Sequence, residues 1–335
     1  MQASLLKDTR FIDHTGIKTP VIGGPMYPCS NPELVAAISE AGGIGVVQPI
    51  SLTYVHGYDF REGLRYIRQL TDKPIGMNAL IEQSTGRYHE RMKQWIDIAL
   101  EENIRFFITS LGKPGWVVDR VHRSGGIVYH DTTNRKYAMK GIHAGVDGLI
   151  CVNGRAGGHT GEKDALTLFN ELKDMDVPLI CAGGISTQQD FLDTLDMGYA
   201  GVQLGTAFIA TNECKASDQY KQAILNAKES DITYSERFTG VPVSVIRTPA
   251  IERMGIKPGL IARWLLKGNK TKHFIRTIYA LRSIVQLKKA LLDRTGSKEL
   301  WQAGKSVAGI KRIRPAGEIV QSFHDVLAET DKELD

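Results

Sequence analysis

Short apolar runs recur between residues 20 and 204, and polar residues do not alternate within them. Such runs, rich in valine and isoleucine, are typical of strands that are buried on both faces, as parallel strands are. We expect eight strands, at residues 20–24, 43–48, 74–79, 104–110, 126–130, 148–152, 177–182 and 200–204.

Segments with helical signals separate these runs. Asn31 precedes Pro32, which places an N-cap residue before a proline at the first helical position. Residues 87–103 and 187–197 are amphipathic. Eight strands that alternate with helices predict an α/β fold, a (β/α)8 barrel. A doubly wound sheet is the alternative, but the spacing of the sixth and seventh strands and the placement of the glycines favour the barrel.

The alternation of strand and helix patterns ends after Thr211. We expect a helix within 213–228, an extended segment at 239–248 and a closing helix at 315–333. The stretch 255–294 has a helical pattern and holds ten lysines and arginines against a single acidic residue. Such charge runs are usually solvated, although a membrane-surface helix or a cover over an anionic ligand remain alternatives. The predicted organisation is a barrel core at 14–211 and a mostly helical elaboration at 212–335, which covers the active site at the barrel mouth.

Composition narrows the function. The chain has a formal charge of +5. It lacks the interleaved aromatic and basic residues of proteins that bind single-stranded nucleic acid. No apolar run is long enough for membrane insertion, and the first ten residues lack the apolar core of a signal peptide, so we expect a cytoplasmic protein. The four cysteines are scattered and are expected to be buried thiols, with no metal site. We expect a small molecule as the substrate, and the barrel is compatible with a homodimer.

Glycine-rich turns follow the last two predicted strands. In such barrels ligands bind at the carboxyl ends of the strands, and the final two loops often bind phosphate. Gly183-Gly184 and Gly205 can present backbone N–H groups there, and Thr206 adds a hydroxyl. Two such turns on adjacent strands favour a phosphate site over ordinary tight turns.

Other strand ends supply further candidates. The Asn78 amide both donates and accepts hydrogen bonds, which suits a flavin pyrimidine, although an asparagine that stabilises a turn is equally compatible. Met26 is expected to pack against a ligand ring. His159 lies in a glycine-rich loop after the sixth strand and is the leading catalytic candidate. Weaker candidates are His130, Asp131, Lys305, Tyr27, Tyr54 and Tyr58.

These motifs together resemble the nitronate monooxygenase family, formerly the 2-nitropropane dioxygenases. The resemblance covers about 14–228 and lies in Gly24-Pro25-Met26, the stretch NPELVAAISEAGGIG at 31–45, the AGGHxG motif at 156–161, and the glycine motifs at 182–185 and 201–208. It implies a TIM barrel that binds FMN and oxidises alkyl nitronates with O2 to a carbonyl compound and nitrite, with His159 facing the substrate. The implied FMN-binding residues are Gly24, Pro25, Met26, Asn78, Gly157, Gly158, Gly183, Gly184, Gln203, Leu204, Gly205 and Thr206.

The chain departs from this pattern at Arg155, where many relatives have an acidic residue, and in its long basic C-terminal region. The same barrel and loop occur in FMN-dependent enoyl-acyl-carrier-protein reductases and NADH:quinone reductases, so a reductase that uses NAD(P)H as co-substrate is the alternative. An IMP-dehydrogenase-like enzyme would need a nucleophilic cysteine in a flexible loop, whereas Cys151 lies within a predicted strand. A non-enzymatic phosphate-ligand sensor would bind no chromophore.

Overall fold

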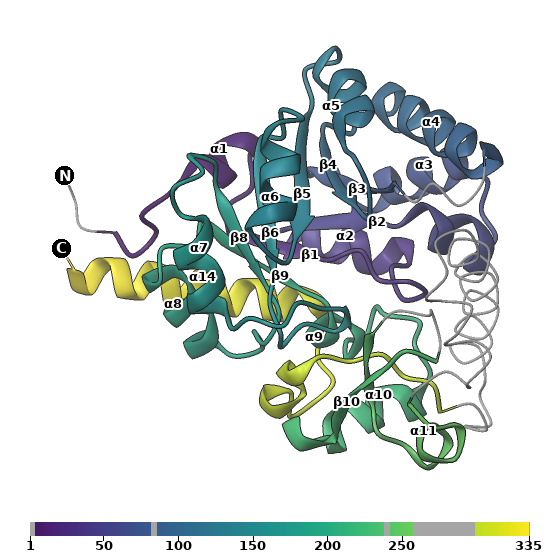
Figure 1. Ribbon diagram of the computed structural model, residues 1–335, viewed down its shortest axis with the longest axis vertical. Helices are drawn as coiled ribbons and strands as arrows, with labels where there is room; N and C mark the ends of the chain where they lie inside the picture. The colour runs from purple at the N-terminus through teal and green to yellow at the C-terminus, as the bar shows by residue number, and fades with distance from the viewer. Residues whose placement is uncertain (1–3, 82–85, 238–241, 257–298, 335) are drawn as a thin grey trace.

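The computed structural model describes residues 4–81, 86–237, 242–256 and 299–334. Eight parallel strands close into a barrel in the order β1-β2-β3-β4-β5-β6-β8-β9 (Figure 1). Their bounds are β1 Val21–Gly23, β2 Ile44–Val47, β3 Ile75–Leu80, β4 Phe106–Ser110, β5 Ile127–Thr132, β6 Gly148–Val152, β8 Leu179–Ala182 and β9 Gly201–Leu204. Each overlaps one predicted run, so the predicted (β/α)8 barrel is confirmed.

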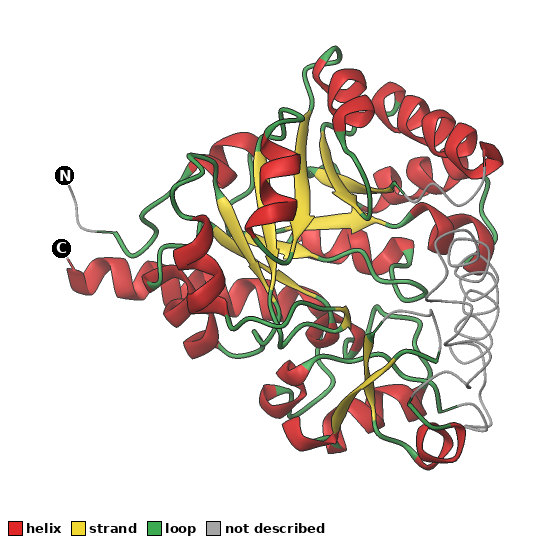
Figure 2. Cartoon of the chain, viewed as in Figure 1, coloured by secondary structure: helices red, strands yellow, loops and turns green. Residues whose placement is uncertain are grey.

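Helices surround the barrel and connect its strands (Figure 2). They are α1 Arg10–Thr15, α2 Pro32–Glu40, α3 Phe60–Leu70, α4 Gly86–Glu101, α5 Gly115–His122, α6 Arg135–Ile142, α7 Ala165–Leu172, α8 Gln188–Asp196 and α9 Thr206–Ile209, with a π-helical turn η1 at Ser51–Val55. A reciprocal capping box between Thr187 and Asp190 begins α8. Asn31 precedes α2 as predicted, but its side chain does not cap the helix. It bonds instead to the backbone at Glu213 and Lys215, after the barrel's last strand.

Side-chain alternation along the strands divides the core into two clusters. The inner cluster fills the barrel and includes Ile22, Val46, Ile108, Tyr129, Ile150, Ile180 and Ala182. The outer cluster lies between the strands and the helices and includes Val21, Val47, Phe107, Leu149, Cys151, Cys181 and Leu204. This division fixes which residues can face a ligand at the top of the barrel.

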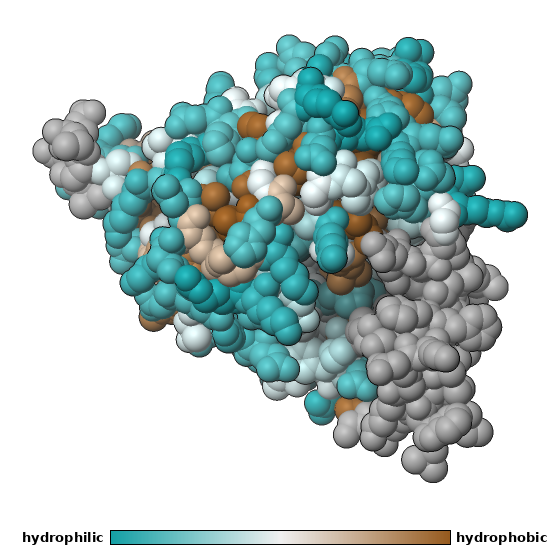
Figure 3. All heavy atoms as spheres, turned by 45° about the horizontal axis from the view of Figure 1, so that its top comes forward, coloured by the Kyte–Doolittle hydropathy of each residue, from teal (hydrophilic) through white to brown (hydrophobic). Residues whose placement is uncertain are grey.

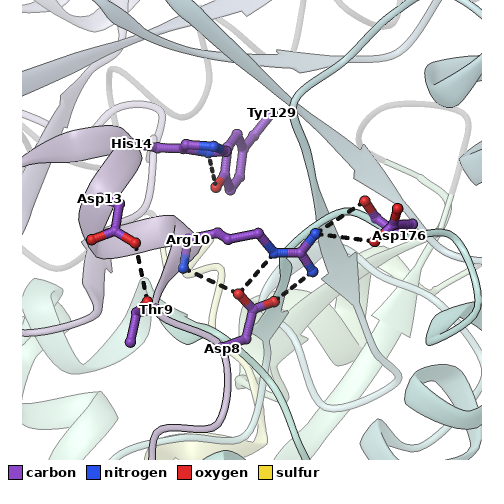
Figure 4. A network of polar contacts seen from close by, with 7 residues as sticks. All are labelled: Asp8, Thr9, Arg10, Asp13, His14, Tyr129 and Asp176. Atoms are coloured by element: carbon purple, nitrogen blue, oxygen red, sulfur yellow. Dashed lines mark hydrogen bonds and ion pairs between the residues drawn. The ribbon is translucent and has the colours of Figure 1, made fainter.

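The short helix α1 lies at the amino ends of the barrel strands, and Figure 4 shows polar contacts that residues in and beside it make there. Phe11 is fully buried, with its ring 5.7 Å from that of Tyr129. His14 Nδ1 lies 3.0 Å from the Tyr129 hydroxyl, and Arg10 pairs with Asp8 and Asp176 at the rim. These aromatic and ionic contacts fill the amino end of the barrel, so a ligand is expected at the carboxyl ends of the strands.

The C-terminal region contains more than helices. Its described elements are α10 Asp218–Asn226, η2 Glu229–Asp231, β10 Ile232–Ser235, β11 Val243–Ile246, α11 Pro249–Met254, η3 Lys305–Gly309 and α14 Ala316–Leu334. Strands β10 and β11 form a three-stranded antiparallel sheet with β7, Gly158–His159, which belongs to the loop after β6. Nearly all of the basic stretch 255–294 lies outside the described residues, and the division into 14–211 and 212–335 stays a prediction.

Helix α14 packs against α2 and α8 on the outside of the barrel (Figure 1). The rings of Phe191 and Phe323 stack 4.7 Å apart and join α8 to α14. The visible face of the molecule is mostly hydrophilic, with small hydrophobic areas, as expected where amphipathic helices turn their polar sides outward (Figure 3). Among the described residues, no helix has the length and hydropathy needed to cross a membrane.

Candidate active site

Three inward-facing polar side chains lie at the carboxyl end of the barrel. Asp131 follows Tyr129 of the inner cluster by two residues, so its side chain points to the same interior. By the same alternation, Asn78 and Gln203 point inward from β3 and β9. The structure therefore brings together the predicted residues Asn78 and Gln203, and adds a carboxyl group.

Each of these side chains has a buried oxygen without a hydrogen-bond partner in the described part of the chain. They are Asn78 Oδ1, Asp131 Oδ1 and Gln203 Oε1. Buried polar atoms are nearly always bonded, and an orphaned one needs an explanation such as a ligand. A planar heterocycle with N–H and C=O groups along its edge, as in a flavin pyrimidine, would offer its N–H to one of these oxygens and its C=O groups to the amide N–H groups of Asn78 and Gln203.

Gly183 and Gly184 form a turn after β8 that has no room for a side chain at either position. Their φ angles are +117° and +87°, which residues with a Cβ rarely adopt. A Cβ on Gly183 would lie 2.5 Å from the Ala156 nitrogen, and one on Gly184 would lie 2.6 Å from Arg155 Nε. The turn is thus packed directly against the loop that follows β6.

Asn153 holds these two loops together and was not singled out from the sequence. It is fully buried, donates a 2.9 Å hydrogen bond to the Gly183 carbonyl and accepts a 2.8 Å bond from the Arg155 N–H. Its position directly after a predicted strand, before the glycine-rich loop, was the available signal. Asn153 therefore fixes the spacing between the loop that follows β6, called the histidine loop because it contains His159, and the predicted phosphate turn at Gly183 and Gly184.

The second predicted phosphate turn lies at the start of α9. Gly205 has a φ of −119°, and a Cβ there would meet only Met26, at 3.5 Å from Sδ. Thr206 Oγ1 accepts a 3.0 Å hydrogen bond from the Gly304 N–H, which leaves its hydroxyl hydrogen free to donate. The Leu204 side chain belongs to the outer core, so only the backbone of that residue faces the site.

Residues 301–305, which we call the strap, cross the site from the C-terminal region. The Ala303 N–H bonds to Ser244 of β11, Gly304 bonds to Thr206, and the Lys305 N–H bonds to the Arg155 carbonyl at 2.9 Å. A Cβ on Gly157 would lie 2.9 Å from the Gly304 nitrogen, which shows how closely the strap covers the AGGH motif. Lys305, a weaker candidate in the sequence, therefore does lie beside the site.

Charged side chains also connect the strap to the loop that follows β6. Arg155 pairs with Glu229 at 2.7 and 3.1 Å, and Lys305 Nζ lies 3.7 Å from the same carboxylate. This cluster has one more positive than negative group. It lies beside Gly184, because the Arg155 side chain covers that glycine.

His159 lies on β7, held by antiparallel pairing with Val243 of β11. Its side chain is exposed, yet the protein around it desolvates the ring and lowers its pKa below the usual 6.5. This combination fits a side chain on the wall of a cavity, which contacts solvent but has protein on most sides. At neutral pH the ring is therefore neutral, with one nitrogen able to accept a proton.

His130 is separated from this group. It faces outward, where Nδ1 lies 2.8 Å from Thr109 Oγ1 and a Cβ on Gly141 of α6 would lie 3.1 Å from its ring. Burial lowers the pKa of His130 to about 4. His130, a weaker candidate in the sequence, therefore faces the surrounding helices and not the barrel interior. Met26 is half-buried near Gly205, with its N–H bonded to Ser30 Oγ, while Gly24 is bonded to the Leu204 carbonyl.

Comparisons with known proteins show the family to which this chain belongs. The model of a family described as nitronate monooxygenase matches residues 8–325. A dehydrogenase of a hydroxy-methyl-oxo-octahydroindene-carboxyl-CoA from Rhodococcus jostii is 27% identical over 320 residues, covering 94% of this chain and 87% of the relative. A probable nitronate monooxygenase from Staphylococcus aureus is 25% identical over 303 residues, covering 78% of this chain and 84% of the relative.

Solved structures are also similar. FabK from Thermotoga maritima has a TM-score of 0.79 and 25% identity, with 98% of both chains covered. A nitroalkane oxidase from Streptomyces ansochromogenes has a TM-score of 0.76 and 23% identity, with 97% and 99% covered, and shows the shared fold. The barrel, its site and the family match together define a flavin-dependent oxidoreductase. The chain belongs to the nitronate monooxygenase family.

Proposed function

We propose that this protein is an FMN-dependent oxidoreductase that oxidises alkyl nitronates with O2, giving a carbonyl compound and nitrite. The observation that supports it most is the placement of His159 on β7, in the loop that packs against Gly183 through Ala156 and against Thr206 through Gly157. FMN combines a phosphate with a flavin ring, and the residues present fit both parts: glycine turns for the phosphate and orphaned oxygens for the ring edge.

Gly183, Gly184, Gly205 and Thr206 would hold the phosphate, and Asn78 and Gln203 the ring edge. The bound flavin supplies electron transfer from the substrate to O2. Neutral His159 offers one N–H donor and one acceptor nitrogen. It can therefore donate a hydrogen bond to a nitronate oxygen, or remove the proton on carbon from a neutral nitroalkane.

The strap and β11 keep the histidine in place while this happens. Backbone pairing of β7 with β11 fixes the direction of His159, and the strap covers Gly157 on the other side. The net positive charge of the Arg155, Glu229 and Lys305 cluster favours anions in this region. The family's anionic substrate and a phosphate-bearing cofactor both suit such a field.

A thioester oxidoreductase, with NAD(P)H as a co-substrate where it acts as a reductase, is the second candidate. The observation in its favour is the Rhodococcus jostii relative, which is named for a carboxyl-CoA substrate and is aligned with 94% of this chain. Anaerobic addition of an alkyl nitronate separates the two. Bleaching of the flavin absorbance by the nitronate supports the proposal, whereas bleaching by NADH alone favours a reductase.

We expect His159→Ala to keep its flavin and to lose turnover by about 10²–10⁴-fold, the range for a removed acid–base group. The wild-type rate should be level at neutral pH and should fall as pH drops below about 6.5, because the lowered pKa leaves the ring protonated only in acid. This acidic limb should be absent from the residual activity of the variant. Full turnover in His159→Ala would remove His159 from the mechanism.

A further inference from the structure

The carboxyl group of Asp131 has no role in the function proposed above, yet it lies in the flavin site. It faces the barrel interior from the end of β5, on the same face as Tyr129. Its Oδ1 atom is fully buried and has no partner in the described part of the chain, like the oxygens of Asn78 and Gln203. A carboxylate in such a place loses hydration and gains nothing in return.

We propose that Asp131 contacts the bound flavin and makes flavin affinity and reduction potential depend on its own protonation state. This inference rests on the flavin part of the proposed function and not on the choice of substrate. The ring edge of a flavin offers one N–H, at N3, among several acceptor atoms. Asn78 and Gln203 can donate to those acceptor atoms through their amide N–H groups, whereas the carboxyl group of Asp131 can donate only when it is protonated.

The surroundings of Asp131 support this role. Burial alone raises the pKa of Asp131 to about 7, so the group changes charge near neutral pH. Ile150 of β6 lies opposite Asp131 in the sheet, and on β4 Ser110 follows Thr109, which pairs with His130; neither Ile150 nor Ser110 is ionisable. Burial raises the pKa of the Cys151 thiol on β6, and the Asp131 charge raises it further, so this thiol stays neutral. Neither His130 nor His159 perturbs the Asp131 carboxyl.

Two consequences follow from electrostatics. Flavin binding excludes water from the cavity, so it favours the neutral carboxyl group, and above pH 7 the wild type must take up a proton to bind. Two-electron reduction adds negative charge to a flavin, and an ionised carboxylate beside it disfavours that charge. Both effects weaken as the pH falls and Asp131 becomes neutral.

The test is the dissociation constant of FMN for the apoprotein between pH 5.5 and 8.5, compared with that of Asp131→Asn. We expect wild-type affinity to fall by up to tenfold for each pH unit above about 7. Asp131→Asn should keep only the dependence that comes from the FMN phosphate itself. Asp119→Asn removes the same charge from an exposed position on α5 and should behave like wild type.

The reduction potential of bound FMN gives a second reading. At pH values high enough to ionise Asp131 in the complex, which lie above its apoprotein pKa of about 7, the potential should be higher in Asp131→Asn than in wild type, by about 30 mV for each tenfold gain in preference for reduced flavin. The difference should disappear at pH 5.5. Identical pH profiles of affinity and potential in the two proteins would overturn the inference, while leaving the proposed nitronate chemistry intact.

The apoprotein provides a check on folding. A raised carboxyl pKa stabilises the fold fully below 3.8, and this contribution is lost as pH rises to about 7. Asp131→Asn should therefore gain thermal stability relative to wild type across this interval and keep the gain above it. A wild type that binds no FMN at any pH would overturn both the inference and the FMN assignment.

Discussion

Gly183 combines two constraints at a single Cα atom. Its φ of +117° strains any other residue, and an added Cβ would lie 2.5 Å from the Ala156 nitrogen, which belongs to the backbone and cannot rotate away. We expect Gly183→Ala to purify with little flavin and to lose about 1–3 kcal/mol of unfolding free energy, the usual cost of such backbone strain. Flavin absorbance per protein and urea unfolding measure the two effects.

Gly205→Ala is the matched control at the neighbouring turn. Its φ of −119° suits any residue, and the added Cβ would meet Met26 Sδ at an ordinary 3.5 Å. This variant should keep its flavin, whereas a bulky residue there should press on Met26 and reduce flavin content. Equal flavin loss in Gly183→Ala and Gly205→Ala would show that the two turns do not differ as their geometry indicates.

The sequence indicates residues such as Gly183 because glycine pairs directly after apolar runs are visible without a structure. Asp131 was grouped with His130 as a weaker candidate for a physical reason. Successive side chains on a strand point to opposite sides, and the sequence does not say which of two neighbours faces inward. The inner cluster, which contains Tyr129, decides this for Asp131.

Among the elements, the strap depends on Gly304. A Cβ on this residue would lie 2.6 Å from both the Arg155 carbonyl oxygen and the Gly157 nitrogen. We expect Gly304→Ala to displace the strap from the AGGH motif, so that turnover falls more than flavin content, because His159 loses its fixed position. Steady-state kinetics and flavin stoichiometry on the same preparation give both values.

Gly115→Ala supplies the comparison for this variant. Gly115 begins α5, and its added Cβ would have a single neighbour, Ala144 Cβ at 3.9 Å. Both turnover and flavin content should match wild type. If Gly304→Ala were as active as Gly115→Ala, the strap would not hold the histidine loop.

Strands of the barrel are predictable because burial on both faces gives each one an apolar run. β7 could not be predicted this way, since it has two residues, glycine and histidine, and exists only through its pairing with β11. The same holds for the strap, whose hydrogen bonds join residues far apart in the chain. The part of the site at the ends of the barrel strands was therefore predictable from the sequence. The part that depends on pairing with the C-terminal region was not.

On the scale of the whole molecule, α14 connects the first half of the barrel to the second. It packs on α2 and α8, and the fully buried Phe323 stacks on Phe191. We expect Phe323→Ala to reduce the unfolding free energy by about 3–5 kcal/mol, since a large cavity remains in the core. Chemical denaturation followed by circular dichroism measures this value.

Phe323→Leu retains most of the apolar volume and should lose clearly less. The exposed neighbour Gln321 offers a further control, because Gln321→Ala on the same helix should change stability by no more than about 0.5 kcal/mol. Similar losses in all three variants would mean that the stacking of Phe191 and Phe323 does not join the two halves.

The strap has a consequence for the order in which the protein matures. All eight barrel strands have been synthesised by residue 204, whereas the groups that bond to Thr206 and Arg155 arrive near residue 304. A nascent chain that has just left the ribosome up to β9 can close its barrel with both glycine turns formed and the histidine loop still unanchored. The glycine turns can therefore form before the strap is made, whereas the loop that carries His159 gains its last anchors only when residues 303–305 follow.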